Sequence, residues 1–185
     1  MKRVAVLFSG AGSNLKYILD NIHQKEIEVV VAITNNPNAG GIIFANEYNI
    51  PLYILDSKLF KDREKFDAKI VKKLEEYNPD LTVLAGFMRI LTPIFTDNIK
   101  AINLHPSLLP KHKGIKAIER SYEDSSQFGG VTLHWVTSEL DGGEIILQKE
   151  VDKSNLSFKE YESRVKTIEK IALVEGILDT TKDWR

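Results

Sequence analysis

The strongest constraint on the fold is a set of short apolar runs, each followed closely by turn-forming residues. Residues 4–8 and 29–33 contain no polar side chain, and residues 81–85 contain only Thr82. Runs of this length, bounded by glycine, proline or asparagine, are typical of strands buried on both faces of a sheet. Such strands have to be covered by helices on both sides, so these runs predict an α/β fold.

Segments with helical spacing alternate with these runs. Apolar residues recur every three or four positions in residues 14–22, 42–48 and 66–74, and the last of these helices is expected to end before Pro79. Further strands are predicted at residues 52–55 and 101–104. The alternation predicts a three-layer arrangement in which a mostly parallel central sheet has helices on both faces.

The C-terminal part of the chain follows another pattern. Residues 131–136 alternate between apolar and polar, which predicts a strand covered on one face, and residues 145–151 form a second strand after Asp141-Gly142-Gly143. These strands are expected to form a partly antiparallel C-terminal pair. A last helix is predicted from Ser157 to about residue 178, because Ser157 and Glu160 have capping-box spacing.

Composition narrows the class of protein. A chain of 185 residues fits one domain, residues 1–185. With 25 Lys and Arg against 26 Asp and Glu, the net charge of −1 argues against a partner that is nucleic acid or anionic membrane. The absence of cysteine excludes thiolate nucleophiles and cysteine metal sites. With no membrane-length apolar run and no signal-peptide pattern at Met1, the expected location is cytoplasmic.

The loop after the first predicted strand has the composition of an anion site. Gly10 and Gly12 allow a sharp turn, and Ser13 and Asn14 open the next helix, whose N-terminus carries partial positive charge. The alternative is a tight turn in which Ser13 or Asn14 caps the helix. A dinucleotide site is disfavoured, because Leu15 stands where a third glycine is needed and no acid follows residues 29–33. A small substrate with one phosphate is the simplest ligand.

A possible catalytic pair lies at the end of the strand at residues 101–104. Asn103 and His105 are two residues apart and therefore point to the same side, and Pro106 favours an extended backbone at His105. A carboxamide can stabilise a developing oxyanion and an imidazole can move a proton. The alternative is a polar strand end satisfied by loop backbone. No serine or cysteine nucleophile motif is present, which favours direct transfer over covalent catalysis.

Asp141 and the remaining histidines are open to structural interpretations. Asp141-Gly142 alone is typical of a hairpin turn, and it gains a catalytic meaning only if its carboxylate reaches His105. The other histidines are interpreted as a helix-end residue, a strand residue and a solvated residue of a basic loop: His23, His134 and His112. Because no pair has the spacing of a zinc site, no metal is predicted.

Four motifs occur in order along nearly the whole chain. They are Ser-Gly-Ala-Gly-Ser-Asn at residues 9–14, Ala-Gly-Phe-Met-Arg-Ile-Leu at 85–91, Asn-Leu-His-Pro-Ser-Leu-Leu-Pro at 103–110 and Leu-Asp-Gly-Gly at 140–143. This set resembles the phosphoribosylglycinamide formyltransferases, folate-dependent enzymes of purine synthesis. The segment at 103–110 with the later aspartate is shared by users of 10-formyltetrahydrofolate in general, whereas the opening motif is more particular to the glycinamide ribonucleotide branch.

The resemblance implies that a substrate amine attacks the formyl carbon of 10-formyltetrahydrofolate. By this analogy, Asn103 holds the formyl oxygen, His105 stabilises the tetrahedral intermediate or donates a proton, and Asp141 tunes His105. The chain departs from the family at His112, where an aromatic residue is common, and lacks a proline shortly after Glu169. Neither departure affects the three catalytic positions.

The resemblance also assigns the binding residues. It places the phosphate site in residues 1–100 and the catalytic and folate-binding half in residues 101–185, with two small-molecule substrates as partners and a monomer or homodimer as the assembly. Without it, residues 88–91 are interpreted as core and Arg63 as a solvated helix start. The implied ribonucleotide contacts are Gly10, Gly12, Ser13, Asn14 and Glu169, and the implied folate contacts are Arg63, Met88, Arg89, Ile90, Leu91 and Leu140.

Three other functions remain possible from the sequence. A hydrolase of the same formyl donor is expected to carry a regulatory segment before the first strand, which here starts at Arg3. A sugar formyltransferase is expected to bind a nucleotide-sugar, which fits a monophosphate loop less well. A non-catalytic folate or nucleotide-binding module has no need for Asn103, His105 and Asp141 together.

Overall fold

The computed structural model describes residues 1–182, and the chain divides into two compact units between Ile102 and Asn103. The strand order is β3-β2-β1-β4-β5-β6-β7. Strand β5 (Ala101–His105) begins in the first unit and ends in the second. The predicted α/β class, with a mostly parallel sheet and an antiparallel C-terminal pair, is confirmed. The assignment of separate roles to residues 1–100 and 101–185 stays a prediction.

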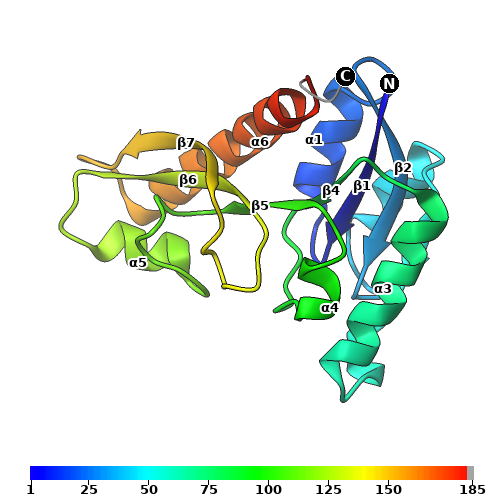
Figure 1. Ribbon diagram of the computed structural model, residues 1–185. Coiled ribbons are helices and arrows are strands. Elements are labelled where there is room, and N and C mark those ends of the chain that lie inside the picture. The colour runs from blue at the N-terminus through cyan, green and yellow to red at the C-terminus, as the bar shows by residue number, and fades with distance from the viewer. Residues whose placement is uncertain (183–185) are drawn as a thin grey trace. The chain divides into compact units, whose positions relative to one another are not determined.

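The first unit is a parallel sheet between helices. Strand β1 pairs with β2 on one side and β4 on the other, and β3 extends the sheet beyond β2. Helices α1 and α3 lie on opposite faces of these strands (Figure 1). The elements are β1 (Lys2–Phe8), α1 (Ser13–Asn21), β2 (Ile27–Thr34), α2 (Ile42–Glu47), β3 (Leu52–Ile54), the 3-10 helix η1 (Ser57–Leu59), α3 (Arg63–Tyr77), β4 (Leu81–Leu84) and α4 (Pro93–Thr96).

The local sequence explains both ends of α3. The side chain of Asp62 accepts hydrogen bonds from the backbone N–H groups of Glu64 and Lys65, and Asn78 ends the helix in the left-handed conformation. Phe66, Ile70 and Leu74 lie on the buried face of the helix. The predicted end before Pro79 is confirmed.

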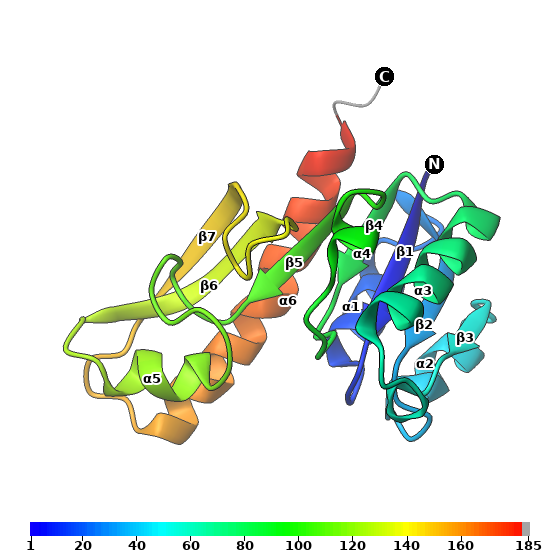
Figure 2. The ribbon, with the colours of Figure 1, turned by 60° about the horizontal axis from the view of Figure 1, so that its bottom comes forward.

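The second unit contains the end of β5, α5 (Ala117–Glu123), β6 (Phe128–Trp135), β7 (Ile145–Asp152) and α6 (Phe158–Lys182). Strands β6 and β7 pair in antiparallel fashion, and α6 runs along them (Figure 2). The predicted capping box is present at the start of α6: Ser157 Oγ accepts from Glu160 N–H at 3.3 Å, and Glu160 Oε2 accepts from Ser157 N–H at 2.8 Å. Gly176 lets the helix approach β6, since a Cβ there would lie 1.8 Å from Leu133 Cδ2.

The prediction that β6 is covered on one face only is wrong. The strand is buried from Gly129 to His134, so both of its faces are covered. Helix α6 packs on β6, and the chain after β5 folds over the side of Thr132, whose hydroxyl donates to Ser107 O at 2.7 Å and accepts from Leu109 N–H at 3.0 Å. The sequence alternates between apolar and polar residues here because the polar side chains of Thr132 and His134 are buried and form hydrogen bonds inside the protein.

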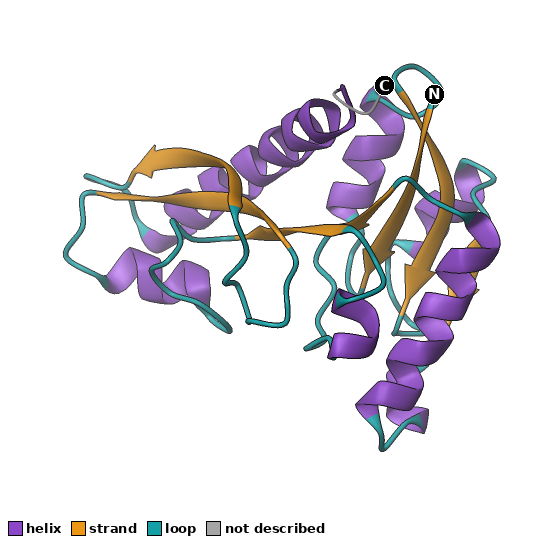
Figure 3. Ribbon diagram, in the orientation of Figure 1, coloured by secondary structure: helices purple, strands orange, loops and turns teal. Residues whose placement is uncertain are grey.

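Loops in the second unit bring distant parts of the chain together. The connection from β5 to α5 and the connection from β6 to β7 lie side by side (Figure 3). Two contacts join them: Gly114 N–H donates to Asp141 Oδ2 at 2.8 Å, and Lys113 Nζ pairs with Glu139 Oε1 at 2.8 Å. These loops hold the polar side chains of the candidate site.

Candidate active site

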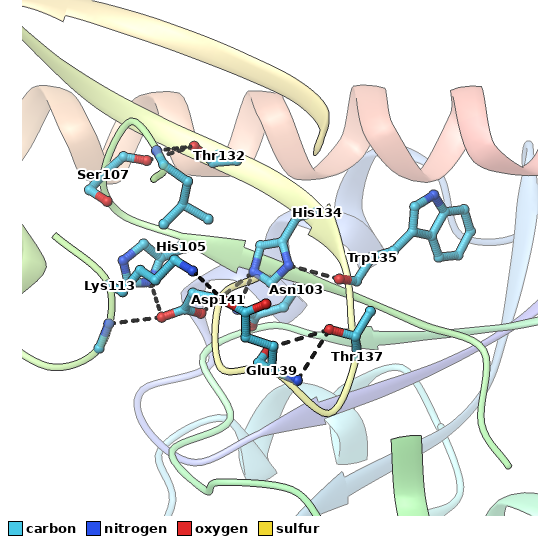
Figure 4. A network of polar contacts seen from close by, with 12 residues as sticks. Asn103, His105, Ser107, Lys113, Thr132, His134, Trp135, Thr137, Glu139 and Asp141 are labelled. Carbon is cyan, nitrogen blue, oxygen red and sulfur yellow. Dashed lines mark hydrogen bonds and ion pairs between the residues drawn. The ribbon is translucent and has the colours of Figure 1, made fainter. Parts of the chain in front are cut away.

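The end of β5 and the β6–β7 connection bring His105 and Asp141 into contact. His105 Nδ1 lies 3.4 Å from Asp141 Oδ2 (Figure 4). Both residues are buried, with exposed fractions of 5% for His105 and 9% for Asp141. The carboxylate therefore does more than form a turn, and the condition for a catalytic interpretation of Asp141 is met. Asn103 lies two residues before His105 on the same side of β5.

The surroundings of Asp141 keep it ionised. Burial by itself raises the pKa of a carboxyl group, but the imidazole of His134 and the amide of Gly114 hold the pKa of Asp141 below its usual range. Asp141 has a positive φ of 50°, a conformation that aspartate tolerates better than most residues. The loop thus presents a fixed negative charge to His105.

Both ring nitrogens of His105 face hydrogen-bond acceptors. Nδ1 faces the Asp141 carboxylate, and Nε2 lies 2.8 Å from the backbone oxygen of His112. Burial lowers the pKa of His105, while the His112 carbonyl and the Asp141 carboxylate act in the opposite direction. A neutral imidazole has one N–H and can serve only one of these acceptors, whereas the protonated ring serves both. Burial outweighs these two acceptors, so the pKa of His105 lies below its ordinary value, and the His112 carbonyl and the Asp141 carboxylate limit that decrease.

His134 belongs to this network, although its position in a strand gave no sign of it. His134 Nε2 lies 3.2 Å from Asn103 Nδ2 and 3.6 Å from Asp141 Oδ1, while its Nδ1 lies 2.9 Å from the backbone oxygen of Trp135. His134 Nε2 therefore lies between the Asn103 carboxamide and the Asp141 carboxylate. The sequence indicates that His134 and Thr132 lie on one face of β6, but it does not show which residues of neighbouring strands and loops that face contacts.

His112 is also not the solvated loop residue that was expected. Its side chain is half-buried, and Nε2 lies 2.7 Å from Asp124 Oδ2. Its backbone oxygen contacts His105. His112 therefore contacts the candidate site through its main chain and, through its side chain, the residue that follows α5.

The predicted phosphate loop lies at the carboxyl end of β1 in the first unit. Gly12 has a positive φ of 74°, and α1 begins after it without a hydrogen bond from a side-chain cap. The first backbone N–H groups of the helix are thus left for another partner, which suits an anion. Ser13 is exposed, and Asn14 has a buried Oδ1 without a hydrogen-bond partner in the described residues.

The predicted folate residues of the first unit are not a hydrophobic core. Met88 is 73% exposed and Ile90 is 52% exposed, so core packing does not explain them. Leu91 is half-buried, and the Arg89 guanidinium lies over the Phe66 ring at 4.2 Å. This segment adjoins the phosphate loop, because Met88 N–H donates to Ser9 Oγ at 2.7 Å. Arg63 is exposed as the first residue of α3.

Two predicted binding residues lie elsewhere in the second unit. Leu140 is exposed beside Asp141 in the β6–β7 connection. Glu169 lies on α6, where burial raises its pKa to about 7 even though Lys166 and Lys170 act to lower it. Among the described residues, no hydrogen bond or ion pair joins Glu169 to Asn103, His105 or Asp141.

Within residues 1–182, no three histidine, aspartate or glutamate side chains are grouped so that they could hold a metal ion. No helix in that part of the chain is long and apolar enough to span a membrane.

Known proteins are similar to this chain over most of its length. A family model described as formyl transferase matches residues 2–177. Phosphoribosylglycinamide formyltransferase of Haemophilus influenzae is 41% identical over 155 residues, which are 82% of this chain and 73% of the relative. The crystal structure of phosphoribosylglycinamide formyltransferase from Campylobacter jejuni is 48% identical, with a TM-score of 0.95 and 97% of each chain covered. The human trifunctional purine biosynthetic protein adenosine-3 is 41% identical over 153 residues, and the match covers 80% of this chain but 15% of that protein.

Proposed function

Because the chain belongs to the phosphoribosylglycinamide formyltransferase family, we propose that it moves a formyl group from 10-formyltetrahydrofolate to the amine of 5-phosphoribosylglycinamide in purine biosynthesis. The observation that carries the proposal is the contact between the Asp141 carboxylate and the buried His105 ring. A buried imidazole held by a carboxylate next to a carboxamide is suited to the formation and collapse of a tetrahedral intermediate.

The chemistry follows from the three side chains. The free amine of the ribonucleotide attacks the formyl carbon, and the carbonyl oxygen gains negative charge. The Asn103 carboxamide, oriented by His134, donates a hydrogen bond to that oxygen. Protonated His105 stabilises the charge and supplies a proton as the bond between the formyl carbon and the folate nitrogen breaks. The attacking amine loses one proton, which replaces the proton that His105 gave up, and the Asp141 carboxylate faces the ring before and after the transfer.

We assign the two substrates to different residues. The phosphate of the ribonucleotide is assigned to the uncapped start of α1, with Gly10, Gly12, Ser13 and Asn14. Glu169 is assigned as an acidic contact of the ribonucleotide. The folate is assigned to the exposed apolar residues Met88 and Ile90 with their neighbours Arg89 and Leu91, to Arg63 and to Leu140. No metal and no nucleic acid takes part in this scheme.

The first prediction concerns the reaction itself. We expect the purified protein to consume 10-formyltetrahydrofolate only when 5-phosphoribosylglycinamide is present, as followed by the absorbance change of the folate. The amine is required because the proposed mechanism uses it as the nucleophile. Equal consumption with and without the amine would identify the chain as a hydrolase of the same donor.

The second prediction concerns the phosphate loop. Asn14→Ala should weaken ribonucleotide binding by about 10-fold, the effect of losing about one polar contact to a charged group, with folate affinity unchanged in calorimetry. Asn14 is a better probe than Gly12, because a Cβ at Gly12 would lie 2.3 Å from Gly41 Cα and disturb packing. Asn21→Ala at the other end of α1 is the matched control. Unchanged ribonucleotide affinity in Asn14→Ala would leave the loop with a structural role only.

A further inference from the structure

Lys153 is a buried ammonium group at the end of β7. Its exposed fraction is 8%, and its Nζ lies 2.6 Å from Asp124 Oδ1. It also donates to Asp124 O at 3.0 Å and Tyr122 O at 3.3 Å, and it contacts Ser121 O. These oxygens belong to the last turn of α5 and the residue that follows it, where a cation is favoured by the helix dipole. The ammonium thus fixes the position of Asp124.

Asp124, which is held by Lys153, also forms a hydrogen bond with His112. Burial by itself raises the pKa of Asp124, but hydrogen bonds from Lys153, His112 and the Ser126 N–H hold it well below its usual range. The group is therefore a carboxylate that can only accept, so His112 Nε2 must carry the proton in their 2.7 Å hydrogen bond. One carboxylate oxygen binds Lys153 and the other binds His112.

His112 connects this ion pair to the reaction centre. The residue has a positive φ of 57°, and its backbone oxygen lies 2.8 Å from His105 Nε2. Neighbouring contacts also restrain the loop: Ser107 Oγ donates to Lys111 O at 2.6 Å, and Gly114 N–H donates to Asp141. The contact of the His112 side chain with Asp124 is therefore one of the restraints on the carbonyl group that faces the His105 ring.

We propose that Lys153, Asp124 and His112 form an anchor that positions the imidazole of His105 from its Nε2 side, opposite the Asp141 carboxylate. The inference rests on the proposed function only in taking His105 as catalytic, and His112 acts as a positioning residue. The anchor depends on a residue in which this chain departs from the family, because His112 stands where an aromatic side chain is common. The anchor gives a role to buried Lys153 and to His112, whose backbone is in the left-handed conformation, and the reaction scheme assigns no role to either residue.

The test replaces the side chain of His112 and keeps its backbone. His112→Asn suits the left-handed conformation, but its amide is too short to reach Asp124. We expect kcat for formyl transfer to fall about 10-fold with both KM values unchanged, because misplacement of a catalytic group affects the transition state. The matched control is Lys111→Asn, on the same loop with an exposed side chain, which should keep wild-type kinetics.

A second readout does not depend on activity. Besides burial, four groups act on the pKa of His105: the His112 carbonyl and the Asp141 carboxylate raise it, and the His134 imidazole and the Arg120 guanidinium lower it. When the carbonyl is released, NMR of ring-labelled histidine should show His105 titrating at lower pH in His112→Asn and at the wild-type pH in Lys111→Asn. Asp124→Asn should change kcat and the titration in the same direction, and the double variant should lose no more activity than the stronger single variant.

The outcomes separate the two proposals. Wild-type kinetics and an unshifted His105 titration in His112→Asn would overturn the anchor and leave the proposed function intact. A lower melting temperature with wild-type kcat would reduce the anchor to a structural element and also overturn it. If the wild-type protein transferred no formyl group, the proposed function would fail, and the titration of His105 would still decide whether the anchor acts on the ring.

Discussion

His105→Ala is expected to lower kcat for formyl transfer by about 1,000-fold, within the range for loss of a general acid or base. The ring is buried, contacts Asp141 at 3.4 Å and has no neighbour of similar chemistry able to replace it on the same strand. Steady-state kinetics measure the loss. The affinity for the folate should change by less than about 3-fold in calorimetry, because the folate is assigned to other residues.

The comparison of turnover with binding makes this prediction specific. A variant that lost turnover and folate affinity together would point to a disturbed binding site, and circular dichroism with a melting curve would show whether the fold had changed. Near-wild-type kcat in a folded His105→Ala protein would contradict the mechanism.

Asp141→Asn is expected to lower kcat by about 100-fold or more, because the variant keeps the shape of the side chain but removes the charge that stabilises protonated His105. The sign of the pH effect follows from the same contact. The Asp141 carboxylate raises the pKa of His105, so its removal lowers that pKa further below the ordinary value. Since the proposed mechanism uses protonated His105 as the proton donor, kcat should begin to fall at lower pH in the variant than in the wild-type protein as pH rises.

Glu139→Gln is the matched control for Asp141→Asn. Glu139 is a carboxylate of the same loop, but it is exposed and pairs with Lys113. The control should keep the wild-type kcat and pH profile, since exposed ion pairs contribute little. If Asp141→Asn behaved like Glu139→Gln, the carboxylate would have no part in catalysis.

Much of the fold could be predicted because its strongest signals are local. Residues 4–8 and 29–33 are buried strands in the structure as in the prediction, and the capping box of Ser157 and Glu160 opens α6. The short elements η1, α4 and α5 were missed, although the equally short α2 was predicted, because each of the three carries too few apolar residues to show a period. The cover on both faces of β6 was missed because it comes from residues distant in the sequence.

For the candidate site, too, the sequence identified some residues but not the contacts between them. Asn103 and His105 could be singled out from their spacing on one strand, and Asp141 from the resemblance to a family. The contact of Asp141 with His105, the placing of His134 beside Asn103 and the tie from His112 to Asp124 all depend on how loops and strands distant in sequence pack together. No local pattern encodes such contacts, so the sequence could name residues of the site but not its network.

The central claim is that the pair of His105 and Asp141 drives formyl transfer to an amine, and a labelled formyl carbon tests it most directly. With 10-formyltetrahydrofolate carrying carbon-13 in its formyl group, wild-type protein should place the label on the amine nitrogen of 5-phosphoribosylglycinamide, as seen by NMR. His105→Ala and Asp141→Asn should leave nearly all of it on the folate over the same time. Label released as formate by the wild-type protein, or transferred equally fast by both variants, would contradict the account.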